Sequence, residues 1–253
     1  MRRALSAFGL AALLALAACT GPTTSPTTAT TSPTSGSPGP SADRPAGDTP
    51  TSAPATVHLT GPAGAAALTV EAPAGARVTT TPAAPGSTRV TVSGLARGSD
   101  VVVRATAPDG ASLRDELDGT IVVEAAGGAA LGGLARPGET AEVERGRVVL
   151  SASGTVTLWV GAGTPRSAAW GTHDGGRSLA VDPNPWARAA GLAGGEATWS
   201  ALVVDHPDAN RPGMHDQLVC HALGAPDKAT WNLEPWRPDV GLVATLAARC
   251  NPS

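Results

Sequence analysis

TVTLWV, Thr155 to Val160, alternates polar and apolar residues with a period of two. In an extended chain the apolar residues at positions 156, 158 and 160 fall on one face. RVTVS, Arg89 to Ser93, has the same pattern, with both valines on one side. Both stretches therefore predict β-strands that bury one face.

The region from residue 56 to residue 163 repeats this pattern and is rich in valine, threonine, glycine and proline. Turn signals such as Pro108-Asp109-Gly110 and Arg136-Pro137-Gly138 separate some of its segments. Many short strands at this spacing predict an all-β domain, an antiparallel sandwich or barrel. We interpret it as a spacer or presentation module, because it holds no cluster of catalytic residue types. Further strands are predicted at residues 66–71, 76–81, 100–106, 120–124 and 145–151.

Residues 164–253 differ in composition, because they hold five of the six tryptophans, four of the five histidines and two cysteines. Asn184-Pro185 is typical of a helix N-cap followed by proline in the first turn. Apolar residues at helical spacing predict three helices, the last of which would align Val243, Leu246 and Cys250. We therefore predict a small α+β domain with a strand at 178–181 and helices at 196–204, 214–223 and 239–249.

Residues 1–18 have the features of a secretory signal peptide, with Arg2 and Arg3 ahead of an apolar run too short to span a bilayer. The run ends in Leu16-Ala17-Ala18-Cys19, which resembles a bacterial lipobox whose cysteine becomes acylated. An ordinary signal peptide with an accidental cysteine is the alternative. We expect a lipoprotein held at the cell membrane through acyl chains on Cys19, with its folded part outside the cytoplasm.

Residues 19–55 consist mainly of threonine, serine, proline, alanine and glycine. Such a segment cannot bury enough apolar area to offset the entropy lost on ordering. We expect a disordered tether between the membrane and the folded part.

The cysteine count supports secretion. If Cys19 carries lipid, Cys220 and Cys250 remain, and an oxidising compartment favours joining them. Loop entropy predicts that a bridge across this separation stabilises the fold by about 3.6 kcal/mol. A thiol-reactive or metal-binding pair is the alternative, but neither cysteine has a CxxC neighbour. We predict the disulfide.

The charge of the chain argues against nucleic acid as a partner. The formal net charge of −3 becomes −5 once Arg2 and Arg3 are removed with the signal peptide. Lys228 is the single lysine, so no polybasic patch exists for nucleic acid or for anionic lipid headgroups.

The remaining motifs predict neither a metal nor a cofactor. His215 and His221 would lie about 120° apart on a helix, whereas zinc-binding pairs use i and i+4 on one face. The segment from Asp208 to Gly213 resembles the start of a calcium loop, but Val219 stands where a bidentate glutamate belongs. One open alternative is a hydrolytic site formed by convergence of His173, His206, His215 and His221 with Asp205, Asp216 and Glu234.

The stretch DKATWNLEPWRPDVG, Asp227 to Gly241, concentrates two tryptophans in a chain with few aromatics. We refer to residues 231–238 as the Trp-rich segment. Its prolines favour extended backbone, and Glu234 could pair with Arg237. We expect a structural role first, and binding or acid–base catalysis remain as alternatives. The candidate binding residues are Trp231, Asn232, Glu234, Trp236 and Arg237.

The C-terminal motifs resemble those of the bacterial domain of unknown function 2599 family. They are RPGM at 211–214, DQLVCH at 216–221, WNLEPWRP at 231–238 and CNP at 250–252, and the similarity spans residues 165–253. The resemblance implies a secreted or lipid-anchored envelope protein. It does not indicate which activity, if any, the protein has.

Taken together, these features favour a non-enzymatic envelope protein that binds a cell-wall polymer or another envelope protein. One alternative is a hydrolase that acts on an envelope polymer, with Glu234 and a histidine as acid and base. A purely structural module with no ligand is a third possibility.

Overall fold

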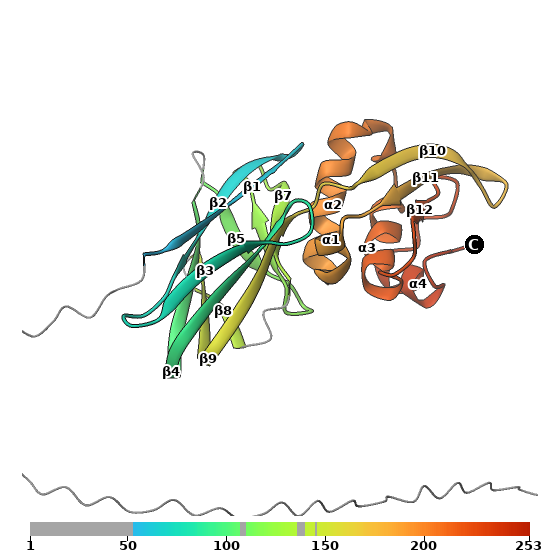
Figure 1. The fold of residues 1–253 in the computed structure, drawn as a ribbon. Coiled ribbons are helices and arrows are strands. Elements are labelled where there is room, and N and C mark those ends of the chain that lie inside the picture. Colours follow the sequence, from blue (N-terminus) through green and yellow to red (C-terminus); the bar gives the residue numbers. More distant parts are fainter. Residues whose placement is uncertain (1–52, 107–109, 136–139, 145) are drawn as a thin grey trace, which may run out of the picture. The chain divides into compact units, whose positions relative to one another are not determined.

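Two long strands, β4 (Ser87–Thr106) and β9 (Arg147–Ala162), form the centre of an antiparallel sheet (Figure 1). They belong to a computed structural model whose described residues are 53–106, 110–135, 140–144 and 146–253. Both alternating stretches lie in this pair, where Val90 opposes Leu158 and Val92 opposes Val156. All four side chains are buried, so the prediction of half-buried antiparallel strands is confirmed.

The sheet has nine strands within the described residues, in the order β1-β2-β4-β9-β7-β6-β5, with β3 on β4 and β8 on β9. The predicted runs 100–106 and 145–151 are parts of β4 and β9 rather than separate strands. Strand β7 was not predicted, because it is buried on both faces and does not alternate. The remaining strands are β1 (Ala55–Gly61), β2 (Gly64–Glu71), β3 (Arg77–Pro82), β5 (Ser112–Asp115), β6 (Ile121–Glu124), β7 (Ala130–Leu134) and β8 (Thr140–Glu144).

A bend in β4 lets one continuous sheet form a sandwich-like body. The pairing of β4 with β9 shifts register between Ser93 and Ser99. Gly94 and Gly98 lie in this stretch with φ of 78° and 69°, which favours glycine. Valines from both sides of the bend belong to the same buried apolar cluster, so the two halves of the sheet share a core.

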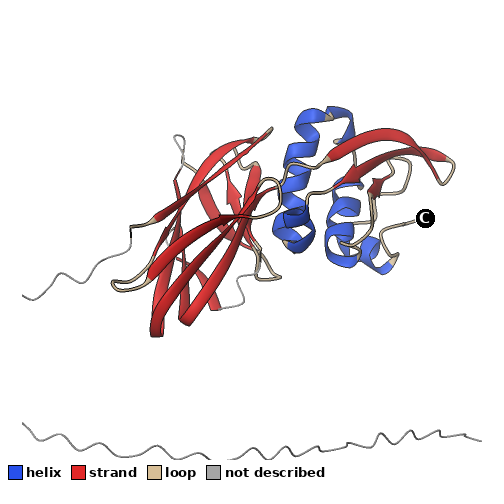
Figure 2. Cartoon of the chain, viewed as in Figure 1, coloured by secondary structure: helices blue, strands red, loops and turns tan. Residues whose placement is uncertain are grey.

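The C-terminal region combines a small antiparallel sheet with helices, as predicted. The sheet has the order β10-β11-β12, from β10 (Ser167–His173), β11 (Gly176–Asp182) and β12 (Trp231–Leu233). The helices of the described residues all follow β11 in the chain, and Figure 2 shows them gathered beside the small sheet. They are α1 (Pro185–Ala189), α2 (Gly191–Asp205), the 3-10 helix η1 (Pro207–Ala209), α3 (Met214–Gly224) and α4 (Leu242–Ala247). Among the described residues, no helix is long and apolar enough to cross a membrane.

One face of the small sheet forms the core of this region. Leu179 pairs with Leu233, and Val181 pairs with Trp231. All four side chains are fully buried and pack with Leu202, Met214 and Leu218 from α2 and α3. Helices α2 and α3 therefore each bury apolar side chains against the sheet.

The disulfide between Cys220 and Cys250 is present, as predicted, and both residues are buried. It joins α3 to the segment that follows α4. The prediction of a helix over 239–249 is wrong in extent, and Val243 is 82% exposed rather than on a buried face. Arg249 and Cys250 have φ of 54° and 67°, so the right-handed helix cannot continue to the bridge.

Helix α1 begins as predicted, because the Asn184 side chain accepts a hydrogen bond from Ala187 N at 2.8 Å. Helix α2 instead begins at Gly191, five residues before the predicted Glu196. Its free N–H groups are satisfied from the turn after β5: Leu192 N donates to Asp118 Oδ2 at 2.8 Å, and Ala193 N donates to Thr120 Oγ1 at 3.1 Å. A cap supplied by another part of the chain leaves no local sequence signal.

Close packing joins α1 and α2 to the large sheet. Trp186 is fully buried, and its Nε1 donates to the Trp159 carbonyl oxygen at 3.2 Å. A Cβ atom on Gly161 would lie 2.3 Å from Trp186 Cγ, and one on Gly163 would lie 2.2 Å from the Ala197 backbone. Glycine is required at both positions, because any side chain would separate the packed surfaces.

All described residues fall within one compact unit. The division of the chain between residues 163 and 164 therefore stays a prediction. The predicted signal peptide, Cys19 and nearly all of the 19–55 tether lie outside the described residues.

We expect Asp118→Ala to lower the free energy of unfolding by about 1 kcal/mol, because α2 loses an acceptor at its first turn. In a chain of this size the melting temperature should fall by about 2–4 °C. Asp115→Ala is the matched control, because that side chain is exposed at the end of β5. Equal shifts for both variants in thermal denaturation would contradict the role of Asp118.

Candidate functional site

The first half of the Trp-rich segment is structural. Trp231 and Leu233 are fully buried in the core of the C-terminal region, whereas Asn232 is half-buried. Trp231 therefore has no free surface for a ligand. The predicted alternation of sides holds for these three residues of β12.

Glu234 is buried, with 1% of its surface exposed. Its backbone N–H donates to Gln217 Oε1 at 2.8 Å, and its carbonyl oxygen accepts from Gln217 Nε2 at 3.1 Å. The Gln217 amide thus completes the hydrogen bonds at the free edge of the chain after β12, as a further strand would. The carboxylate is held at a defined position as a result.

Arg237 neutralises this buried carboxylate. Its Nε pairs with Glu234 Oε2, as the sequence suggested, and its Nη2 lies 3.1 Å from Asp174 Oδ2. Its Nη1 donates to the Pro252 carbonyl oxygen at 3.2 Å. The guanidinium therefore links the Trp-rich segment to the β10–β11 turn and to the C-terminal end of the chain.

His173 completes the cluster from the end of β10. Its Nδ1 lies 3.0 Å from Glu234 Oε1 and 3.5 Å from Asp174 Oδ1. The side chains of His173 and Asp174 are 51% and 53% exposed, so the cluster has a buried side and an open side. The sequence placed His173 among four histidines that could converge with Glu234, but it did not single His173 out, because the two residues are sixty-one positions apart and no local motif joins them.

Trp236 differs from the other tryptophans. All six lie in the described residues, and Trp236 alone is exposed, at 46% of its surface. The Cζ atom of Arg237 lies 4.4 Å from the centre of its ring. A Cβ atom on Gly176 would lie 2.2 Å from Trp236 Nε1, so the ring lies directly on this glycine.

The other histidines do not join this cluster. His215 Nε2 lies 3.1 Å from Glu196 Oε1, and this hydrogen bond raises the pKa of His215. His221 Nε2 donates to the Asn232 carbonyl oxygen at 3.2 Å. Of the histidines considered for a hydrolytic site, only His173 forms a hydrogen bond with Glu234.

Asp208 begins the segment that resembles a calcium loop. Its carboxylate is engaged by other side chains. Arg177 Nη2 lies 2.5 Å from its Oδ2, and Trp170 Nε1 donates to its Oδ1 at 3.2 Å. The Arg177 hydrogen bond lowers the pKa of Asp208. Arg177 also stacks on the Trp170 ring, with its Cζ atom 3.6 Å from the ring centre. This arrangement packs the hairpin against η1 and leaves both carboxylate oxygens engaged.

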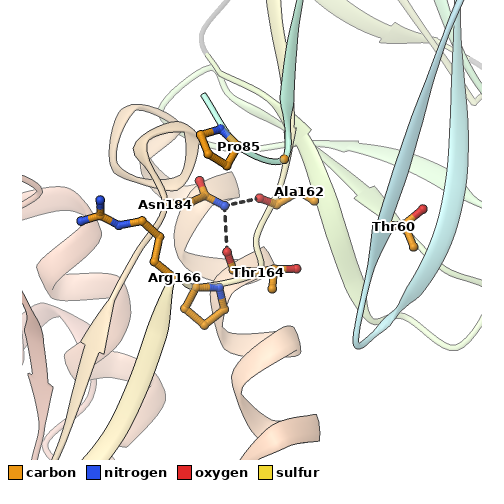
Figure 3. A pocket seen from close by; sticks show the side chains of 8 residues that line it. Thr60, Pro85, Ala162, Thr164, Arg166 and Asn184 are labelled. Carbon is orange, nitrogen blue, oxygen red and sulfur yellow. Dashed lines mark hydrogen bonds between the residues drawn. The ribbon is translucent and has the colours of Figure 1, made fainter. Parts of the chain in front are cut away.

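The larger hollows in the described part of the chain lie away from the Trp-rich segment. Figure 3 shows one of about 320 Å³, where Asn184 Nδ2 donates to the carbonyl oxygens of Ala162 and Thr164 at 2.7 and 2.9 Å. Because these donors are already used, Asn184 serves the fold here. Another hollow, of about 450 Å³, lies beside the disulfide and is lined by residues that include Lys228 and Arg249. None of the Trp-rich residues lines either hollow.

His221 is a buried neutral imidazole. Burial, with a smaller contribution from the charge of Lys228, lowers its pKa from 6.5 to about 4. Its Nδ1 has no hydrogen-bond partner within the described part of the chain. Below pH 6.5 the unfolded chain takes up a proton that the folded chain does not bind. The contribution of His221 to stability is therefore complete above the unfolded pKa and is lost as the pH falls toward 4.

We expect the free energy of unfolding to decrease by up to about 3 kcal/mol between pH 6.5 and pH 4 because of His221. The measurement is urea denaturation across this range for the parent and for His221→Gln, whose amide can still donate to Asn232. The difference between the two curves isolates His221 from other titrating groups. Parallel curves would contradict the prediction.

Comparison with known proteins identifies the C-terminal region. Residues 166–253 match the family model described as Protein of unknown function (DUF2599). Uncharacterized proteins of Mycobacterium tuberculosis and Mycobacterium bovis are 39% identical over 93 residues, which cover 34% of this chain and 61% of each relative. A Mycobacterium leprae relative is 36% identical over 81 residues, or 30% of this chain and 60% of its own length.

The chain thus spans about three fifths of the length of these curated relatives. No solved structure matches it. The C-terminal motifs therefore identify residues 166–253 as similar to the DUF2599 family, as the sequence predicted, and the known relatives are uncharacterized.

Proposed function

We propose that the C-terminal region is a non-enzymatic module that binds a saccharide polymer of the cell envelope at Trp236. One observation carries the proposal: Trp236 is the exposed tryptophan of this chain, while Trp231 in the same segment is fully buried. An exposed aromatic ring has an apolar face on which the C–H groups of a sugar can stack.

The Trp236 ring is held in place before any ligand arrives. Arg237 lies against the ring, and Arg237 is itself held by Glu234 and Asp174. The close approach to Gly176 fixes the ring from the hairpin side. Binding would therefore cost little side-chain entropy, which favours recognition by a single aromatic anchor.

Polar groups lie next to this ring. Gly176, which contacts Trp236, is the cross-strand partner of His173, and Asp174 follows in the turn. The side chains of His173 and Asp174 are half exposed and offer hydrogen bonds to hydroxyl groups. An aromatic face with such neighbours suits a sugar ring better than a purely apolar ligand.

The negative net charge of the chain disfavours polyanionic ligands. Without the predicted signal peptide the formal net charge is −5, and Lys228 is the single lysine. A polyanionic polymer would be repelled over the approach, whereas a neutral glycan would not. We therefore expect a neutral wall polysaccharide as the ligand.

The proposal places this module at the cell surface through acylation of Cys19. The support is the sequence of residues 1–18, the small residues before Cys19 and the threonine- and proline-rich residues 19–55. Two acyl chains would be needed for stable anchoring, because a single chain binds membranes reversibly.

A hydrolase is the second candidate, and the distance of 3.0 Å between His173 Nδ1 and Glu234 Oε1 favours it. A carboxylate can orient an imidazole so that its other nitrogen acts as a base. Glu234 itself is poorly suited as an acid, because Arg237 engages its second oxygen and 1% of the residue is exposed. Within this candidate, His173 would carry the proton transfer.

For the binding function, we expect Trp236→Ala to abolish co-sedimentation with purified cell-wall polysaccharide, because it removes the stacking surface. By analogy with aromatic side chains that stack on bases, the loss of one stacking aromatic should weaken binding by about 1–3 kcal/mol, or roughly 5- to 150-fold. The chain carries Cys19→Ser in all samples so that acylation cannot cause sedimentation. Val243→Ser is the matched control, because this apolar side chain is 82% exposed elsewhere in the same region.

The melting temperature of Trp236→Ala should stay close to that of the parent, whereas Trp231→Ala should unfold more easily because it empties a core site. If a folded Trp236→Ala variant sediments with the polysaccharide as much as the parent does, saccharide binding at Trp236 is contradicted. Release of soluble sugars by the parent, and not by His173→Gln, would instead support the hydrolase.

For the anchor, we expect the chain expressed with its own N-terminus in a bacterial host to incorporate a labelled fatty acid, and Cys19→Ser to incorporate none. Cys19 is the site because it follows the predicted cleavage point. Fractionation should find the parent with the membrane. Equal labelling of both proteins would contradict acylation at Cys19.

A further inference from the structure

Three side chains with metal-ligating atoms converge beside the Trp-rich segment. His173 comes from the end of β10, Asp174 from the turn that follows and Glu234 from the chain after β12. One ligand atom of each lies within 4.8 Å of the others. Distant parts of the sequence therefore provide a histidine and two carboxylates at one place.

Both carboxylates approach the same nitrogen of His173. The distances from Nδ1 are 3.0 Å to Glu234 Oε1 and 3.5 Å to Asp174 Oδ1. In a tetrahedral zinc site with bonds of about 2.0–2.2 Å, neighbouring ligand atoms are about 3.3–3.6 Å apart. The two distances from His173 Nδ1 are therefore close to those between ligand atoms that share one zinc ion, and all three atoms lie within 4.8 Å of one another.

Arg237 occupies the opposite oxygens of the two carboxylates. Its Nε pairs with Glu234 Oε2, and its Nη2 lies 3.1 Å from Asp174 Oδ2. Glu234 Oε1 and Asp174 Oδ1 are the oxygens left on the side of the imidazole. Hydrogen bonds of this kind orient carboxylate ligands in metal sites.

A buried hydroxyl on the same face of the sheet lacks a partner. Ser178 is 3% exposed, and its Oγ has no hydrogen-bond partner within the described residues. The pairing of Leu179 with Leu233 puts Ser178 beside Glu234 in the sheet register, and Ser178 shares its face with His173 through Gly171. Ser178 Oγ is therefore free to form a hydrogen bond with a water molecule on this face of the sheet.

We propose that His173 Nδ1, Asp174 Oδ1 and Glu234 Oε1 bind one zinc ion, with a water molecule as the fourth ligand. Imidazole and carboxylate are ligands that zinc accepts, and three protein ligands with one water are typical of its open sites. Two carboxylates and Arg237 leave one net negative charge, which attracts a cation. His173 and Asp174 are half exposed, so an ion can enter from solvent. This site does not depend on saccharide binding at Trp236.

A second histidine provides an internal comparison. His215 also lies near two carboxylates, but Glu196 approaches its Nε2 at 3.1 Å and Asp216 approaches its Nδ1 at 3.9 Å. The two ring nitrogens point in different directions, so these groups cannot surround one ion. His215→Gln is therefore the matched control for His173→Gln.

The test is isothermal titration calorimetry of the full-length chain with zinc sulfate at neutral pH. Every sample carries Cys19→Ser, has no histidine tag and keeps the disulfide oxidised, so that no free thiol or tag binds zinc. We expect one zinc ion per chain. His173→Gln and Asp174→Asn should weaken binding by more than about tenfold. His215→Gln should bind as the parent does.

Native mass spectrometry of the same samples counts the bound ions independently. Both test variants change half-exposed side chains, and asparagine tolerates the positive φ of 49° at position 174, so both should stay folded. Absence of zinc binding by the parent would overturn the proposal. Unchanged affinity in folded His173→Gln and Asp174→Asn would overturn it equally, because the ion would then lie elsewhere.

Discussion

The buried ion pair between Glu234 and Arg237 is the interaction on which the C-terminal region depends most. Glu234 and Arg237 are 1% and 9% exposed, and loss of either would leave a buried charge without its main partner. Breaking such a pair typically costs about 3–5 kcal/mol. Through Arg237 the same pair fixes the β10–β11 turn at Asp174 and the C-terminal end at Pro252. The positions of His173 and Trp236 follow from this arrangement.

The large sheet contributes directly to the helical region. Gly161 and Gly163 let Trp186 and α2 pack without intervening side chains. Asp118 and Thr120 supply the acceptors that the first turn of α2 lacks. This helix has three glycines near its start, Gly191, Gly194 and Gly195, which lower its intrinsic propensity, so it needs such tertiary support. The all-β part therefore supports α2 as well as forming a core of its own.

The two proposed sites share the β10–β11 hairpin but use different chemistry. Trp236 offers a rigid apolar face, whereas His173 and Asp174 offer polar atoms at the adjoining edge. Arg237 serves both, because it contacts the indole ring and orients the two carboxylates. One buried guanidinium thus connects a stacking surface with a cluster of ligand atoms. The structural role expected for the Trp-rich segment holds for Trp231, and Trp236 is free for recognition.

Local patterns in the sequence were sufficient for much of the fold. Alternation predicted the central strands, the Asn184-Pro185 pair predicted the start of α1, and two cysteines predicted the disulfide. The same holds for the pairing of Glu234 with Arg237, because the partners are three residues apart. Each of these features depends on residues that are close in the chain or on a simple count.

Other features were decided only by the tertiary structure, because they depend on contacts between residues that are distant in the sequence. The start of α2 requires Asp118, more than seventy residues away, and the cluster requires that His173 meet Glu234 across sixty-one residues. The predicted extent of the last helix was wrong for a related reason. The positive φ of Cys250, which is bridged to Cys220, ends α4 early. The sequence alone determined the central strands, the disulfide and the family resemblance. The candidate site exists only because folding brings the hairpin turn to the Trp-rich segment.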